Sequence, residues 1–386
     1  MRIGIIVDNP QRDLAGCVVL AKELTKKNVK TILIPGNLRS YEIGKIKPQY
    51  VLLPNLRWPY IKLAKFLKKN GVKVGVIESE GGFTDNIFDL LQTYDKKFDY
   101  KKLVDDWFFW GPKFQRSFIK HLNLPKENCH IVGNPKFDLY ELSKPKITKE
   151  QILIATGFPF YNNLLGKNET WKSERKHNIS EDDLIRDYAN QERQYLETIE
   201  FIKNIIEIYS NHKFVVRPHP FENLENYTKE ISNHNVFIEN NEPSHQVLQK
   251  SSLLIHFVSS LVYEASLYKL NNIAIKTLIP ENTINSNNPL LKLTKFVDSK
   301  KELIENLEKY IFPRDYSNIY MGDYVFTHRE SSSSNLIASV IYKSEINSIN
   351  KKEINKLSYG FVDGEHFTFL KYSIRRTFNI KLKYRL

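Results

Sequence analysis

Three side chains suited to phosphate binding or proton transfer follow a short apolar segment near the middle of the chain. Arg217, His219 and Glu222 come directly after residues 213–216, a β-branched run that predicts a buried strand. The strand must end near Pro218, because proline lacks the N–H that a central strand donates. At the carboxyl end of a parallel strand, arginine can hold a phosphate through two hydrogen bonds and histidine can donate to a leaving group. The alternative is a proline-rich turn in which these side chains bond only nearby carbonyls.

A second group of polar residues follows another predicted strand later in the chain. Ser259 and Ser260 come after the apolar residues 253–257 and before a helix-compatible segment that contains Glu264. Either serine can cap that helix, and the free N–H groups at a helix start suit a phosphate. The Glu264 carboxylate can accept hydrogen bonds from both hydroxyls of a ribose. The alternative is an ordinary serine-capped helix.

These two groups resemble, in sequence and in order, the C-terminal domain of GT-B-fold transferases of bacterial surface polysaccharide synthesis. The resemblance rests on Arg-Pro-His-Pro at 217–220 and Ser-Ser-x-x-x-Glu-Ala at 259–265. A third segment, Gly-Asn-Pro-Lys-Phe-Asp at 133–138, is similar to the signature that closes the N-terminal domain in this family. The resemblance covers residues 1–310 and is nearest to the surface carbohydrate biosynthesis proteins. The Kdo transferases of capsule and O-antigen, and the CDP-glycerol or CDP-ribitol polymerases, look like more distant relatives.

The resemblance implies an α/β protein with a GT-B-like architecture, in which two Rossmann-like domains face each other across a cleft. It also implies a metal-independent glycosyltransferase without a cofactor, which moves a sugar from a nucleotide-sugar donor to a surface polysaccharide or lipid-linked glycan. The donor is expected to be a CMP-sugar such as CMP-Kdo, and His219 is expected to be catalytic. The residues expected to bind the donor are Arg217, Glu222, Ser259, Ser260 and Glu264.

Other functions on the same fold fit these motifs as well. They are a polyol-phosphate transferase, a nucleotide-sugar epimerase and a non-catalytic scaffold of envelope assembly. Where the polyol-phosphate polymerases have Thr-Asp-Tyr-Ser-Ser, this chain has His-Phe-Val-Ser-Ser at 256–260, which favours a glycosyl donor.

The expected catalytic carboxylate of the N-terminal domain is Glu80. It follows a predicted strand over residues 72–77 and precedes Gly81 and Gly82, which leave room for a sugar against the backbone. Glu78 and Glu80 point to opposite sides while the strand persists, so at most one of them faces a ligand. The resemblance to Kdo-type transferases supports Glu80, as base or as nucleophile. The alternative is a solvated acidic turn.

Further substrate-binding candidates follow the first predicted strand and lie in the 133–138 segment. Arg12 and Asp13 stand in the loop that leads into the first helix, where they could contact either substrate. The alternative for Asp13 is the N-cap of that helix. By resemblance Asn134 and Asp138 bind substrate, whereas an Asn-Pro pair also marks a plain turn.

Composition restricts the class of partner. The net charge of +13 points to an anionic partner, and the absence of zinc-finger, RNP or helix-turn-helix signatures argues against nucleic acid. Two distant cysteines favour neither a disulfide framework nor a metal site. No apolar run approaches the ~20 residues of a membrane span, and the N-terminus has no cleavage site. We therefore expect a cytoplasmic protein that is peripheral at the inner face of the plasma membrane.

The expected organisation is a sequence of three parts. They are an N-terminal acceptor domain over 1–143, a nucleotide-sugar-binding domain over 144–314 that opens with a linker, and crossover helices with a basic aromatic tail over 315–386. Further short apolar runs predict strands at 3–7, 31–34, 50–53, 107–110, 151–155, 236–238 and 271–275.

Three segments outside these strands carry specific expectations. Residues 164–190 are polar and irregular, which indicates a disordered loop or an acceptor lid before a helix over 191–210. A helix over 331–342 is expected to return across the N-terminal domain. The tail at 367–386 interleaves basic and aromatic residues, which suits an anionic membrane leaflet. The alternative for the tail is a helix packed on the body.

Overall fold

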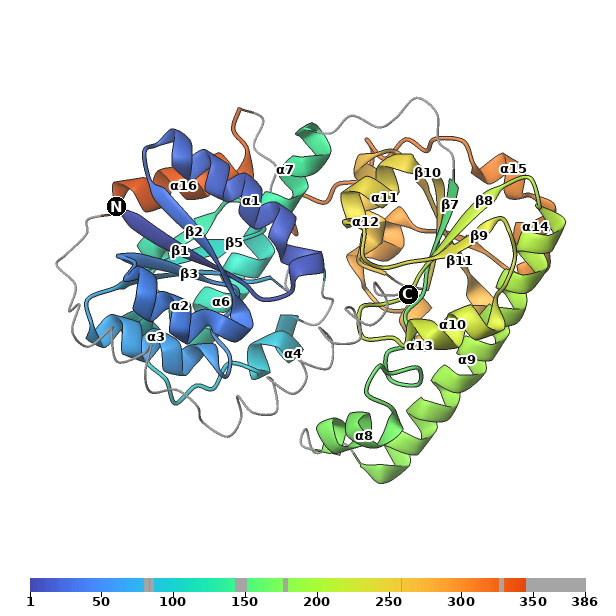
Figure 1. Ribbon diagram of the computed structural model, residues 1–386, viewed down its shortest axis with the longest axis horizontal. Coiled ribbons are helices and arrows are strands. Elements are labelled where there is room, and N and C mark those ends of the chain that lie inside the picture. Colours follow the sequence, from blue (N-terminus) through green and yellow to red (C-terminus); the bar gives the residue numbers. More distant parts are fainter. Residues whose placement is uncertain are drawn as a thin grey trace. The chain divides into compact units, whose positions relative to one another are not determined.

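The computed structural model divides the chain into two compact α/β units (Figure 1). It describes residues 1–79, 83, 87–142, 151–175, 180–257, 259–325 and 330–344. Among these, the first unit holds 1–79, 87–139 and 321–344, and the second holds 83 and 140–320. The chain leaves the first unit within helix α7 (Pro135–Leu142). The linker expected at 144–149, the tail at 367–386, and Glu80, Gly81 and Gly82 lie outside the described residues.

The first unit is built on a parallel sheet with the strand order β2-β1-β3-β4-β5-β6. Ile5 of β1 pairs with Leu33 of β2 on one side and with Leu52 of β3 on the other. Helices cover both faces, so the strands are apolar at successive positions and do not alternate with polar residues. The strands are β1 (Arg2–Val7), β2 (Lys30–Pro35), β3 (Tyr50–Leu53), β4 (Lys73–Ile77), β5 (Asp106–Phe109) and β6 (Cys129–Ile131).

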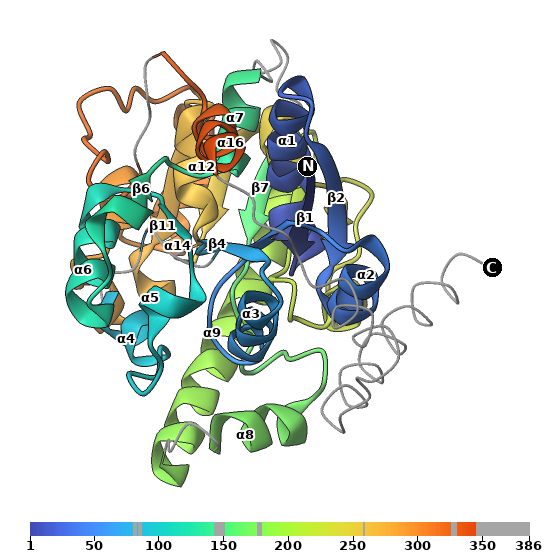
Figure 2. The ribbon, with the colours of Figure 1, turned by 90° about the vertical axis from the view of Figure 1, so that its left-hand side faces the viewer.

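Two apolar cores lie on the two faces of this sheet. On one face Leu20 and Leu24 of α1 pack with Ile337 and Ile341 of α16 against β1 and β3. In both views α16 lies beside α1 (Figure 1; Figure 2). On the other face, apolar residues of helices α2 to α6 pack against the strands and form the second core. The helices of this unit are α1 (Pro10–Lys26), α2 (Arg39–Ile46), α3 (Tyr60–Lys69), α4 (Ile87–Gln92), α5 (Tyr100–Leu103), α6 (Pro112–Leu122), the start of α7, and α16 (Ser333–Lys343).

The second unit has its own parallel sheet, with the order β12-β11-β10-β7-β8-β9. One of its cores lies where α9 packs on the sheet, with Ile199, Ile202 and Ile206 of the helix against strand residues such as Phe214 and Ile255. The strands are β7 (Gln151–Ala155), β8 (Lys213–Arg217), β9 (Val236–Ile238), β10 (Ser251–His256), β11 (Asn271–Ile275) and β12 (Lys295–Val297). The helices are α8 (Lys167–Arg175), α9 (Glu181–Ile208), α10 (Leu224–Glu230), α11 (Ser244–Lys250), α12 (Leu261–Leu267), α13 (Glu281–Ile284), α14 (Lys300–Glu305) and α15 (Leu307–Tyr310).

The expectation of an irregular segment over 164–190 is wrong for its described part. Helix α8 occupies 167–175, and α9 begins at Glu181, ahead of the position predicted for it. Ser180 caps α9 by accepting the N–H of Asp183, and three acidic residues fill the first turn. Acidic side chains in a first turn complement the partial positive charge of the helix start, so the cap was readable from the sequence. The strands predicted from apolar runs are all present, and so is the returning helix, as α16.

The Gly-Asn-Pro-Lys-Phe-Asp segment holds α16 in the first unit. Gly133 has φ 79°, a left-handed conformation that favours glycine, and the Asn134 side chain accepts the N–H of Lys136. The buried Asp138 carboxylate accepts the N–H groups of Ser333 and Ser334, at 3.0 and 2.8 Å. These donors lie at the start of α16, where N–H groups have no partner within the helix. The structure thus gives Asp138 an anchoring role.

No helix within the described part of the chain combines the length and the apolar character that crossing a membrane requires.

The Asp138 contact predicts a loss of stability in Asp138→Asn. The amide replaces one accepting oxygen with an NH₂ group that faces a backbone N–H, so we expect a loss of about 1–3 kcal/mol in the free energy of unfolding. Urea denaturation followed by circular dichroism measures it. Asp187→Asn, on the exposed side of α9, is the matched control and should change stability by less than about 0.5 kcal/mol. Equal losses in both variants would contradict the anchoring role.

Candidate functional site

The candidate donor residues gather at the carboxyl edge of the second sheet. Strands β7 and β10 lie side by side at the centre of this sheet, and the strands that follow each of them extend in opposite directions. Ligands of open α/β sheets bind at such a switch point, beyond the carboxyl ends of the strands. Thr156 follows β7, Arg217 ends β8 and His256 ends β10. The parallel pairing of these strands therefore brings the three loops to one edge.

Arg217 is oriented by a carboxylate from the neighbouring strand end. Its Nη1 donates to Oε1 of Glu239 at 2.9 Å, and its side chain is 10% exposed. The other oxygen of Glu239 accepts the N–H groups of Asn241 and Glu242, so the partner is itself fixed. Glu239 is the side-chain partner of Arg217 among the described residues, which leaves further guanidinium N–H groups for a ligand. Burial lowers the pKa of Arg217, while the charges of Glu239 and then Glu264 raise it.

Glu222 fixes the loop that follows Arg217. The fully buried carboxylate accepts hydrogen bonds from the hydroxyls of Thr156 and Tyr227 and from the N–H groups of His219 and Phe158. A carboxylate has about four acceptor positions, so these four donors use its capacity. Burial raises the pKa of Glu222, and the hydrogen bonds oppose this shift. The structure thus makes Glu222 the residue that shapes this loop.

His219 is exposed on that loop in a defined orientation. Its Nδ1 accepts the N–H of Phe221 at 3.3 Å, and the two rings lie 5.7 Å apart. In the neutral imidazole the proton then resides on Nε2, because an accepting nitrogen carries none. This side chain can donate from Nε2 to an anionic oxygen.

Glu264 is buried within a group of hydroxyls on the same edge. Its Oε2 accepts the hydroxyl of Tyr140 and, at 2.7 Å, that of Ser244. Tyr140 stands in the last turn of α7, in the part that belongs to the second unit. Burial raises the pKa of Tyr140 well above its ordinary value, and the Glu264 charge adds to the rise, so the tyrosine is the donor. The Glu264 charge also favours the charged form of Arg217 and so raises its pKa.

The two serines differ in their surroundings. Ser260 is the N-cap residue of α12, but it makes no side-chain capping bond and is exposed. Ser259, one residue earlier, accepts the N–H of Leu261, the first residue of the helix, through its Oγ at 3.2 Å.

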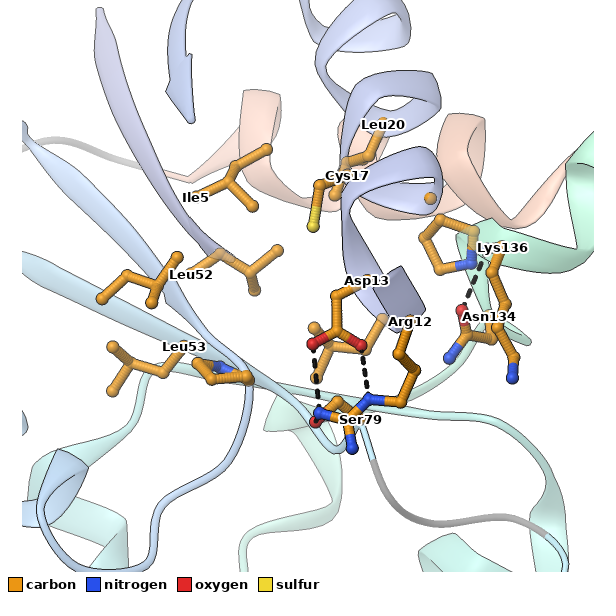
Figure 3. Close-up of a pocket in the computed structure, with 15 residues that line it drawn as sticks. Ile5, Arg12, Asp13, Cys17, Leu20, Leu52, Leu53, Ser79, Asn134 and Lys136 are labelled. Atoms are coloured by element: carbon orange, nitrogen blue, oxygen red, sulfur yellow. Dashed lines mark hydrogen bonds and ion pairs between the residues drawn. The ribbon is translucent and has the colours of Figure 1, made fainter. Parts of the chain in front are cut away.

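In the first unit, Arg12 and Asp13 line a pocket at the carboxyl ends of β1 and β3 (Figure 3). Nε and Nη2 of Arg12 donate to the two Asp13 oxygens, and Nη2 also donates to the Ser79 hydroxyl at 3.1 Å. The expectation that Asp13 is the N-cap is wrong. Asn9 caps α1 by accepting the N–H of Gln11, and Asp13 accepts the N–H of Asn9. Asn134 lines the same pocket.

Glu78, which directly follows β4, is a structural residue. Its carboxylate is 1% exposed and accepts from Arg57 Nη2 at 3.0 Å and from the hydroxyl of Tyr94. Glu80, the other carboxylate of this segment, lies outside the described residues.

Sequence reasoning missed Glu239, Tyr140 and Tyr227. Each acts through a hydrogen bond to a predicted site residue, and no local pattern marks it. For Glu239 alone, its position in the sequence could have indicated a place in the site, because it directly follows the predicted strand 236–238. No cluster of three or more His, Cys, Asp or Glu side chains that could hold a metal ion occurs among the described residues.

The two Rossmann-like sheets define the chain as a protein of the GT-B-like fold class. No protein-family model matches the sequence. No characterised protein sequence matches it either. The relationship to known proteins is therefore seen at the level of structure.

Solved structures that resemble the chain include a wall teichoic acid polymerase and a UDP-GlcNAc 2-epimerase. A variant of the wall teichoic acid polymerase TagF has a TM-score of 0.55 at 12% identity, covering 89% of this chain and 88% of that one. TagF soaked with CDPG has a TM-score of 0.53 at 11% identity, covering 92% and 89%. UDP-GlcNAc 2-epimerase from Neisseria meningitidis, bound to UDP-GlcNAc, has a TM-score of 0.51 at 16% identity, covering 89% and 100%. At these identities the likeness establishes the fold.

The buried His256 predicts a pH-dependent stability. Burial lowers its pKa to about 3 from the ordinary 6.5. Between these values the unfolded chain binds a proton that the folded chain does not, so stability falls as the pH drops below 6.5. From pH 7.5 to pH 5 this costs about 2 kcal/mol. Urea denaturation at both pH values should show that His256→Gln loses about 2 kcal/mol less than wild type on acidification.

The exposed His234 supplies the control for this experiment. His234→Gln should keep the wild-type loss on acidification. If His256→Gln also keeps it, His256 does not titrate as its burial requires.

Proposed function

We propose that the chain is a metal-independent glycosyltransferase that moves a sugar from a nucleotide-activated donor to a surface polysaccharide or lipid-linked glycan, such as capsule or lipopolysaccharide. The observation that carries the proposal is the group of Arg217, His219, Ser260 and Glu264 at the switch point of the second sheet. Two solved structures of this fold, one bound to UDP-GlcNAc and one soaked with CDPG, support a nucleotide ligand here.

Arg217 would bind the donor phosphate. Glu239 holds one guanidinium nitrogen, so the side chain reaches the ligand with its orientation already fixed. Preorganised donors cost no reorganisation when charge develops on the leaving phosphate. His219 would add a hydrogen bond from Nε2 to the same phosphate, and the exposed Ser260 a hydroxyl. These donors would stabilise the leaving group without a metal ion.

Glu264 would hold the ribose of the donor. A carboxylate can accept from both ribose hydroxyls, and Tyr140 and Ser244 hold its Oε2 in place. The remaining element is the base that takes the acceptor's proton, for which we propose Glu80. Ser79, which precedes it in the chain, lines the pocket of the first unit. Peripheral membrane binding through the basic tail, and a cytoplasmic location, stay predictions.

Two other functions have specific support. The likeness to UDP-GlcNAc 2-epimerase favours an epimerase, and the likeness to TagF favours a polyol-phosphate transferase. Nucleotide sugars and CDP-glycerol incubated with the protein distinguish them by mass spectrometry and NMR. An epimerase changes the donor without an acceptor, whereas a transferase releases nucleotide only with one. A scaffold with decayed motifs binds none of them.

Replacing Arg217 should weaken nucleotide binding. Titration calorimetry with UDP, CDP, CMP and GDP should identify one preferred nucleotide, and Arg217→Ala should lose about 1.5–3 kcal/mol of its binding free energy. Arg186→Ala removes an arginine that is 63% exposed on α9 and should bind like wild type. Unchanged affinity in folded Arg217→Ala would refute the phosphate assignment.

Glu264 should distinguish ribose from its dideoxy analogue. Wild type should bind the 2′,3′-dideoxy nucleotide at least about tenfold more weakly than the ribonucleotide, because a buried acceptor loses its partners. Glu264→Gln should weaken the ribonucleotide and reduce this difference. Equal binding of both nucleotides by wild type would refute the ribose assignment of Glu264.

Glu80→Gln should leave nucleotide affinity unchanged and lower turnover by ~10²-fold or more, as the loss of a general base does. Glu127→Gln, at an exposed position of the same unit, is the control. Glu78→Gln does not serve as one, because it breaks the buried pair with Arg57. If Glu80→Gln fails by losing nucleotide affinity, the catalytic carboxylate lies elsewhere.

A further inference from the structure

We propose that the pocket of the first unit is a specificity subsite that receives a small methyl-bearing substituent of an uncharged acceptor sugar. The inference rests on the proposed function, because a transferase needs a second substrate site apart from the donor site of the second unit. The chemical class it names is a glycan residue with an acetamido or 6-deoxy group.

The pocket lies at the switch point of its sheet. In the order β2-β1-β3-β4-β5-β6, the strands beyond β1 and beyond β3 extend in opposite directions, and ligands of such sheets bind at the carboxyl ends there. The lining comes from those strand ends and from the starts of α1 and α7 (Figure 3). Its apolar wall consists of Ile5, Ile6, Leu20, Leu52, Leu53 and Ile77.

The size of the pocket restricts what can enter. Its cavity volume is about 50 Å³. An apolar cavity of ~150 Å³ holds a benzene molecule, so this one suits a methyl group with its attached atom and not an acyl or isoprenoid chain. The backbones of α1 and α7 approach each other closely at Gly16, which narrows the pocket. A Cβ at this position would stand 2.8 Å from the backbone nitrogen of Lys136.

The polar rim favours a neutral ligand with hydroxyl groups. Arg12 is paired with Asp13 and lies 3.8 Å from an Asp8 oxygen, so its charge is balanced. Lys136 directs its ammonium group to aromatic rings, 4.9 Å from the centre of Phe137. The Asp13 carboxylate accepts three hydrogen bonds and has capacity for a further donor. A sugar hydroxyl can supply that bond, whereas a diphosphate would face two carboxylates.

Cys17 lines this pocket, so a larger side chain at this position can fill the pocket, and a thiol reagent can label it. The Cys17 sulfur points from α1 into the pocket (Figure 3). Burial, and then the Asp13 charge, raises the pKa of the thiol to about 12, so the side chain is an uncharged part of the wall at neutral pH. The next residue, Val18, is 49% exposed on the same helix and supplies a matched control.

The test uses the full chain without nucleotide and measures dissociation constants by saturation-transfer NMR for the free sugars N-acetylglucosamine, fucose and glucose, of which glucose alone has no methyl group. One methyl group in a fitted pocket changes affinity by about 10–200-fold. We expect at least one of the first two sugars to bind ~10-fold tighter than glucose, with the strongest saturation at its substituent methyl. Equal binding of all three sugars, or no binding, overturns the proposal.

Filling the pocket should abolish this preference. Cys17→Phe should weaken the preferred sugar by ~10-fold or more, while Val18→Phe should bind it like wild type. Retained binding in Cys17→Phe overturns the proposal. If Cys17→Phe does not fold, a labelling experiment on the wild-type chain tests the assignment. Methyl methanethiosulfonate should modify Cys17 more slowly with the sugar present, as measured by peptide mass spectrometry, and an unchanged rate overturns the assignment.

These outcomes are separate from the proposed function. Sugar binding is measured without a donor, so a chain that binds the sugar but no nucleotide keeps the pocket and loses the transferase assignment. A chain that binds nucleotide but shows no preference for a methyl-bearing sugar keeps the nucleotide site of the proposed function and loses the pocket assignment.

Discussion

Hydrogen bonds from buried tyrosines to carboxylates are the interaction on which the loops of both units depend. Four of the five carboxylates follow a strand at its carboxyl end or stand in the helix after it, where backbone groups leave the sheet and need new partners. Burial raises the pKa of each of these tyrosines, so each remains a donor. A hydrogen bond to a charged group contributes about 1.5–3 kcal/mol, enough to hold one loop conformation. The pairs are Tyr50–Asp106, Tyr60–Asp8, Tyr94–Glu78, Tyr140–Glu264 and Tyr227–Glu222.

The carboxylates that fix the loops determine which side chains can meet a ligand. Glu222 is saturated by its four donors, and its role is to present Arg217 and His219 at the edge of the sheet. Asp138 likewise serves the start of α16. The groups that we propose to contact substrates are Arg217, His219, Ser260 and the Glu264 carboxylate in the second unit. In the first unit they are a charge-balanced rim over an apolar pocket. This difference between the units matches the two substrates of a transferase, an anionic donor and a neutral acceptor.

The fold was predictable from local patterns, and the site only in part. Short β-branched runs such as 213–216 and 271–275 identified the strands, because a parallel sheet covered on both faces requires apolar residues throughout. The same rule placed Arg217 and His219 at a carboxyl edge. The role of Glu222 was not predictable, because its donors Thr156 and Tyr227 come from other elements of the fold. Tyr140 and Glu264 are 124 residues apart in the sequence, so no local spacing indicates that they are in contact. The start of α9 was readable from Ser180 and its acidic neighbours, and was missed because the segment is polar.

We propose that a nucleotide binds at the carboxyl edge of β8 and β10. Hydrogen–deuterium exchange followed by mass spectrometry, on the full chain with and without a saturating nucleotide, measures this binding segment by segment. We expect slower exchange in peptides that cover 217–224 and 259–266, where ligand contacts restrict the loop after Arg217 and the start of α12. We expect no change in peptides that cover 9–17, which line the pocket of the first unit. Protection that is confined to 9–17, or absent from both segments of the second unit at saturation, would contradict it.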